Sequence, residues 1–251
     1  MTESGSTVRR LLGRMFAMPS YPPDAADLRT VRVAGLELPV RASVAIVAVI
    51  LVVIFDFQRT LIPDQLLRYD HNPEEQRMQA FSRLFLFLVV PLAIVILGFR
   101  DRPERYGLQL GDWRWGLGLA VAGCAVMTPL ILVLARLPDF QAYYVPSSEP
   151  LPGLVTTNVL DLFSTEFVYR GFLMLVLARV FGPVGLLVAL FPFTLTHLTK
   201  PESELLSTAA GGAVYGWFTW RTGSIVWGAA AHVYIVTLLI VASTAATASS
   251  G

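Results

Sequence analysis

Residues 115–135 read WGLGLAVAGCAVMTPLILVLA and contain no charged residue. A helix that crosses a bilayer needs about 20 mostly apolar residues, so this stretch by itself predicts a membrane span. Comparable apolar runs cover residues 42–55, 84–99, 182–199, 205–220 and 222–251, and the stretch 151–181 is long enough to span although it contains charged residues. The sequence therefore predicts an all-α fold, a polytopic transmembrane helical bundle of about seven spans.

The composition agrees with a bilayer as the main solvent. Of the 251 residues, 55% are hydrophobic and only 15% are charged, whereas soluble domains carry about 25% charged residues. The formal net charge is +1, and Lys200 is the single lysine. Without a basic patch to follow a phosphate backbone, nucleic acid is excluded as a partner, and the lipid bilayer is the expected one.

The chain shows no internal repeat, so we expect two parts: an N-terminal cytoplasmic segment, 1–40, and a membrane helical domain, 41–251. Arginines concentrate on one side of the expected spans: Arg9, Arg10, Arg14, Arg29, Arg32, Arg41, Arg100, Arg102, Arg105, Arg114, Arg179 and Arg221. The exception is the loop expected after the first span, with Arg59, Arg68, Arg77 and Arg83. The positive-inside rule then predicts a multi-pass protein of the cell membrane with a cytoplasmic N-terminus.

Ionisable residues inside a membrane are costly, and each requires a partner, a water-filled cavity or a function. Glu166 and Arg170 are four residues apart, so on a helix they share a face and favour an intramembrane salt bridge. His197 and His232 lie in two other expected spans, and each alone can be a satisfied core histidine. Together, a carboxylate and two imidazoles from three spans are the parts needed to deprotonate a water or to bind a metal that does so. Asp161 is a second candidate acid, but we expect it at the membrane entry, where it is solvated.

Three short motifs carry a resemblance to a known family: TEFVYR at 165–170, FTLTH at 193–197 and HVYIV at 232–236. In order and spacing they resemble the E-E-x-x-x-R, F-x-x-x-H and H-x-x-x-N/D motifs of the CPBP intramembrane proteases. That family includes the type II CaaX prenyl endopeptidases and bacterial abortive-infection relatives. The resemblance covers about residues 100–245. The sequence departs from the family at Thr165, where a glutamate is usual, and at Val236, where Asn or Asp is usual.

The resemblance implies an intramembrane endopeptidase that cleaves membrane-associated substrates, including lipidated CaaX-type peptides or proteins. Glu166 would activate a water, because Thr165 holds its proton too tightly to act as a base, and Arg170 would orient Glu166. His197 and His232 would position the water and stabilise the oxyanion, or would ligate a metal. We expect a mechanism without a cofactor, with zinc as the alternative.

Two other functions remain open at this stage. A relative that has lost catalysis would bind a membrane peptide or partner protein without cutting it. A transporter with a Glu/His proton relay would also place polar groups inside spans, but the sequence shows no repeated halves. The aromatic segment 138–152 either covers the site or forms an interfacial belt.

Overall fold

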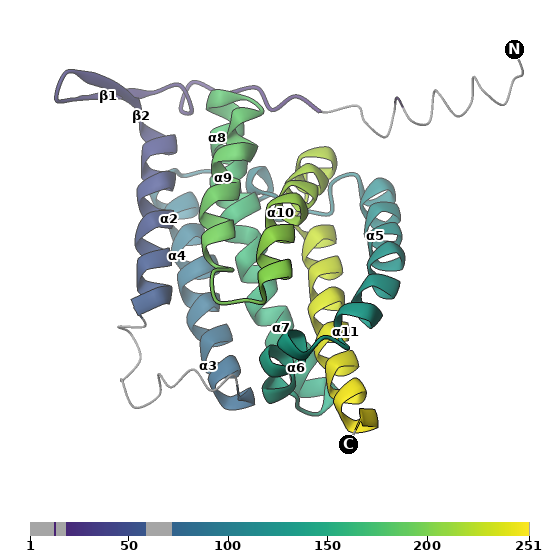
Figure 1. Cartoon of the computed structure of the whole chain (residues 1–251). Helices are drawn as coiled ribbons and strands as arrows, with labels where there is room; N and C mark the ends of the chain where they lie inside the picture. The colour runs from purple at the N-terminus through teal and green to yellow at the C-terminus, as the bar shows by residue number, and fades with distance from the viewer. Residues whose placement is uncertain (1–12, 14–18, 59–71, 251) are drawn as a thin grey trace, which may run out of the picture.

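The computed structural model describes residues 13, 19–58 and 72–250 of the chain, and most of these residues are helical (Figure 1). Strands β1 (Thr30–Val33) and β2 (Leu36–Pro39) form an antiparallel hairpin. The helices are α2 (Val40–Gln58), α3 (Pro73–Arg83), α4 (Val90–Ala93), α5 (Trp113–Leu134), α6 (Pro138–Tyr144), α7 (Leu151–Glu166), α8 (Leu175–Phe181), α9 (Val184–Leu195), α10 (Glu202–Thr222) and α11 (Val226–Ser250). Short 3-10 turns cover Pro103–Tyr106 and Val145–Ser147.

Two long helices contain π-helical segments, where the backbone is wound more widely than in an α-helix. Leu84–Val89 joins α3 to α4 and Ile94–Gly98 continues α4, while Phe167–Met174 joins α7 to α8. Residues 73–98 and 151–181 are therefore two continuous helices. Single π-helical turns occur frequently at functional sites, and the segment after α7 begins directly after Glu166.

The prediction of an all-α membrane helical bundle is confirmed. Four helices of the described residues are long and apolar enough to cross a membrane: Val40–Phe57, Pro73–Gly98, Trp113–Leu134 and Val226–Ser249. The three other expected spans are also helical, as α7 with α8, as α9 and as α10. They are shorter, more charged or less apolar, so the full number of about seven crossings stays a prediction.

One boundary differs from the prediction. Arg77 and Arg83, which we expected in a loop after the first span, lie on helix α3. The Asn72 side chain caps this helix by accepting hydrogen bonds from the backbone N–H groups of Glu74 and Glu75, and Pro73 occupies its first turn. These capping residues outweigh the polar composition that favoured a loop. Arg59 and Arg68 lie outside the described residues.

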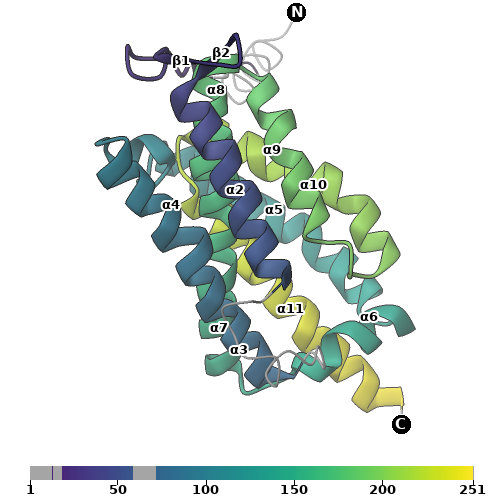
Figure 2. The ribbon, with the colours of Figure 1, turned by 90° about the vertical axis from the view of Figure 1, so that its left-hand side faces the viewer.

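The β1–β2 hairpin lies at one end of the bundle and the last turns of α11 at the other (Figures 1 and 2). Part of the expected N-terminal segment, residues 1–12 and 14–18, lies outside the described residues. The remainder is fastened to the bundle, because the fully buried carboxylate of Asp27 pairs with Arg41 at 2.8 Å, Arg105 at 2.9 Å and Arg179 at 3.3 Å.

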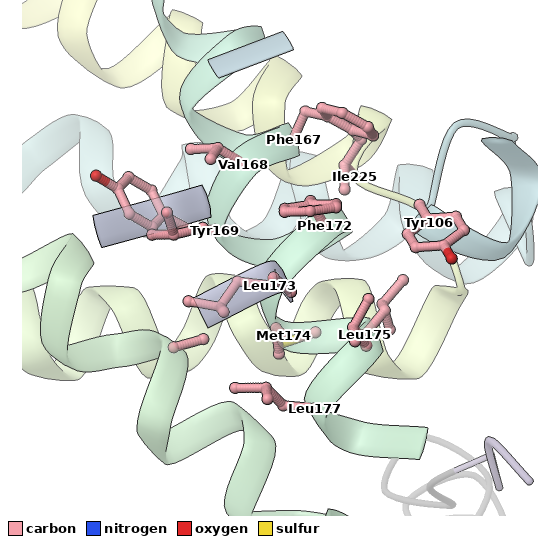
Figure 3. Packing of buried hydrophobic residues seen from close by; sticks show 14 of the residues in the cluster. Tyr106, Phe167, Val168, Tyr169, Phe172, Leu173, Met174, Leu175, Leu177 and Ile225 are labelled. Atoms are coloured by element: carbon pink, nitrogen blue, oxygen red, sulfur yellow. The ribbon is translucent and has the colours of Figure 1, made fainter. Parts of the chain in front are cut away.

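The core centres on the helix formed by residues 167–177, whose apolar side chains point outward to the surrounding helices (Figure 3). Gly171 lies at a close approach of two segments, where an added Cβ would be 2.5 Å from the backbone oxygen of Tyr106. On the other side, Gly212 and Gly216 of α10 face α9, and a Cβ on Gly212 would meet Leu190 at 2.5 Å. These glycines let α9 and α10 approach closely.

Candidate active site

The candidate site is built around the carboxylate of Glu166, the last residue of α7. Its side chain is fully buried, and Oε1 lies 3.3 Å from Nη1 of Arg170, one helical turn further on. The expected i,i+4 ion pair is therefore present. The Arg170 guanidinium also stacks on the Phe193 ring of α9, 3.7 Å from its centroid, so Phe193 packs beside the pair.

His232 of α11 makes the second contact to the same carboxylate. Its Nδ1 lies 2.9 Å from Oε1 of Glu166, and its ring stacks on Tyr215 with centroids 5.0 Å apart. Both partners of Glu166 thus meet Oε1, whereas the buried Oε2 has no hydrogen-bond partner among the described residues. The structure brings Glu166, Arg170 and His232 into one connected cluster from two helices that are distant in sequence.

His197 reaches the site differently. It lies two residues beyond α9, in a turn where its Nδ1 is 3.0 Å from the backbone oxygen of Phe193. This hydrogen bond holds the ring in place, and the side chain is mostly buried. His197 does not touch Glu166 directly, but it shares a cavity with His232.

That cavity has a volume of about 90 Å³. This is room for several waters, since one requires only about 10–15 Å³. It is lined by Gln76, Gln79, Arg83, Phe87, Tyr143, Tyr144, Thr157, Asn158, Asp161, Leu162, Thr165, Thr196, His197, Thr199, Lys200, His232, Val236 and Ile240. Tyr143 and Tyr144 of α6 are part of this wall, which favours the covering role for the segment 138–152 over an interfacial belt.

One wall of the cavity contains an ion-pair network that the sequence interpretation missed. Arg83 binds Asp56 through Nε and Nη2, with the closest contact at 3.0 Å, and binds Asp161 through Nη1 at 3.0 Å. Asp161 in turn accepts a hydrogen bond from the Thr165 hydroxyl at 3.4 Å. Asp161 is therefore ion-paired as well as partly exposed to the cavity, and its partner comes from a helix 78 residues earlier, a separation that no local pattern reveals.

The described residues provide no group of three His, Cys, Asp or Glu side chains placed to hold a metal ion. His197 and His232 share the cavity and leave only their two Nε2 atoms as donors, because both Nδ1 atoms are hydrogen-bonded to protein oxygens, whereas a catalytic zinc site uses three protein ligands. This donor set does not fit the zinc alternative, and we derive no step through a metal. The two departures from the family motifs, Thr165 and Val236, both line the cavity.

Fold and site together define a class: a membrane-embedded helical bundle with a buried, histidine-linked glutamate beside a water-sized cavity. Residues 147–238 match the family model described as type II CAAX prenyl endopeptidase Rce1-like. This match supports the CPBP family membership that the motifs indicated and, more generally, the fold of a CAAX-type intramembrane protease. The matched segment includes Glu166, Arg170, His197 and His232. Comparisons with curated proteins and with solved structures gave no match.

Proposed function

We propose that this protein is an intramembrane endopeptidase that hydrolyses peptide bonds in membrane-associated substrates, including lipidated CaaX-type peptides. The observation that carries the proposal is the 2.9 Å contact between the buried Glu166 carboxylate and His232, whose ring lines a cavity large enough for water. A carboxylate joined to an imidazole is a common arrangement for taking a proton from water.

In this proposal Glu166 and His232 together activate the water. Arg170 keeps Glu166 ionised and fixes Oε1, because the guanidinium lies 3.3 Å from that atom. His197 lies on the same cavity and donates its Nδ1–H to the Phe193 carbonyl, so its Nε2 can accept a hydrogen bond from the attacking water and position it. No cofactor takes part.

The proposal extends to the side from which substrates approach. Arg41 and Arg105 mark the hairpin end of the bundle, because both pair with Asp27 close to the β1–β2 hairpin. The cavity is lined from α3, α6 and the turn after α9, toward the opposite end (Figure 1). With a cytoplasmic N-terminus, as the positive-inside rule predicts, the cavity would lie toward the outer side of a cell membrane. This favours a membrane-anchored peptide presented from the outer side over a soluble cytoplasmic one.

A second candidate function is supported by the cavity wall itself. Thr165 and Val236 place a hydroxyl and an aliphatic group where the family usually has an acid and an amide. Losing one oxyanion donor can lower a rate by about 10²- to 10³-fold. A relative that binds a membrane peptide without cutting it would tolerate both changes.

The test is cleavage of membrane-anchored and prenylated peptides by the purified protein in proteoliposomes. Wild type is compared with Glu166→Gln and His232→Ala, each with and without a chelator. We expect both variants to lose at least about 10²-fold in rate and the chelator to have no effect. Asp56→Asn is the matched control, since Asp56 is a buried, ion-paired acid that is not among the residues lining the cavity.

Thermal unfolding and size-exclusion chromatography establish that each variant is folded. If chelation removes the activity and zinc restores it, the metal-free mechanism is wrong. If folded wild type cleaves no substrate but binds the peptides, the second candidate replaces the first.

A further inference from the structure

The carboxylate of Glu166 and the ring of His232 differ in their access to water. The Glu166 side chain is fully buried. Its neighbours Thr165 and His232 line the cavity, but Glu166 itself is not among the described residues that do so. Its Oε1 is engaged twice, by Arg170 and by His232. A water in the cavity therefore meets His232 before it meets Glu166.

The contact between the two side chains also fixes which nitrogen of His232 faces that water. An ionised carboxylate can only accept hydrogen bonds, so Nδ1 of His232 must carry a proton and donate it to Oε1 of Glu166. In the neutral ring, Nε2 is then the basic nitrogen with a free lone pair. Within the described residues no group is hydrogen-bonded to Nε2, and the ring lines the cavity.

We infer that Nε2 of His232 is the base that takes the proton from the attacking water, and that Glu166 is a positioning residue that holds the ring and stabilises its charged form. This inference rests on the proposed function. It assigns to a histidine the step for which Glu166 would otherwise be the candidate.

The step balances in atoms and charge. One O–H bond of water breaks as its proton moves to Nε2, and the oxygen forms a bond to the carbonyl carbon of the substrate, whose own oxygen becomes negative. The imidazolium is stabilised by Glu166 at 2.9 Å. When the C–N bond breaks, Nε2 returns the proton to the departing amine.

The other groups around His232 do not compete for this role. Tyr215 stacks on its face with centroids 5.0 Å apart, and Arg170 carries a permanent charge that balances Glu166. The Thr165 hydroxyl donates to Asp161, and the Asp161 carboxylate is held by Arg83. His197 shares the cavity, but its Nδ1 is bound to a backbone carbonyl rather than to a carboxylate, so no negative charge stabilises its protonated form.

The experiment is chemical rescue of His232→Ala by imidazoles of graded basicity, measured as peptide cleavage in proteoliposomes. Removing the imidazole ring of His232 leaves a space next to the cavity in which an added imidazole can bind. If the ring is the base, the rescued rate increases with the basicity of the added imidazole. Rescue also persists in the double variant Glu166→Gln/His232→Ala, because the added imidazole still supplies the proton acceptor. His197→Ala is the matched control, and its rescue is expected to show no increase with basicity.

Two results would overturn the inference while leaving the protease function intact. One is a rescued rate that falls as basicity rises, which is the behaviour of a hydrogen-bond donor. The other is complete loss of rescue in the double variant, which would identify Glu166 as the base. If His232→Ala does not fold, His232→Asn replaces it in the same series. If folded wild type cleaves nothing, the proposed function fails and this inference fails with it.

Discussion

Replacing Arg83 by leucine tests whether the ion-pair network stabilises the bundle. Arg83 is bound to two carboxylates, Asp56 at 3.0 Å and Asp161 at 3.0 Å. Removing one member of a buried ion pair costs about 3–5 kcal/mol, because the remaining charge is left unpaired. Asp56 is only 6% exposed and bears most of that cost, whereas Asp161 is 23% exposed and can be hydrated from the cavity. We therefore expect a loss of about 3–5 kcal/mol rather than twice that amount.

The assay is thermal unfolding of the purified protein in detergent, followed by tryptophan fluorescence. For a chain of this size the loss corresponds to a decrease in Tm of roughly 6–20 °C. The double variant Arg83→Leu/Asp56→Asn should recover most of the stability, because it removes the unpaired buried charge. A decrease of less than about 1 kcal/mol, as for a surface ion pair, or no recovery in the double variant, would refute this reasoning.

Three further predictions concern other parts of the molecule. Gly171→Ala should lower the free energy of unfolding by about 1–3 kcal/mol through overpacking, since its Cβ would lie 2.5 Å from the Tyr106 oxygen; thermal unfolding measures this. Partial burial raises the pKa of Asp24, but hydrogen bonds from the Asp27 backbone and from Arg105 outweigh it and lower the pKa to about 2. The stability contributed by Asp24 should therefore be present above about pH 4 and be lost as the pH falls toward 2, and pH-dependent unfolding of Asp24→Asn should lack this component. Val236→Asn should raise kcat of cleavage by up to about 10²-fold by adding an oxyanion donor to the cavity; no increase would place the oxyanion elsewhere.

Local spacing was sufficient to predict the parts of the fold and site that depend on a single helix. Charge-free runs located the long apolar helices, because burial in lipid requires length and composition alone. The spacing of Glu166 and Arg170 predicted their ion pair, because residues four apart share a helix face. The convergence of His232 on Glu166 required a family resemblance as well, since the two lie 66 residues apart.

The remaining features depend on contacts that the sequence does not encode locally. Arg83 was expected in a loop. It lies on α3 instead, and its ion pairs with Asp56 of α2 and Asp161 of α7 form only when these three helices pack together. The same is true of Asp27, whose carboxylate is fully buried among arginines from three separate segments. Charged residues in a membrane protein are costly to leave unpaired, so an isolated charge near an apolar run indicates a partner, but does not indicate which one.

The two substitutions in the family motifs affect the groups that face the cavity and leave the buried contacts in place. Thr165 and Val236 line the cavity, whereas the Glu166, Arg170 and His232 cluster remains connected behind it. If the cluster served only to stabilise the fold, charged residues would bring no advantage, because well-packed apolar residues stabilise a core as well as a buried ion pair does. The cost of burying these charges is more readily explained if they hold His232 in one orientation toward the cavity. In the proposed protease function, hydrolysis would then depend on the ring of His232 rather than on the altered motif positions.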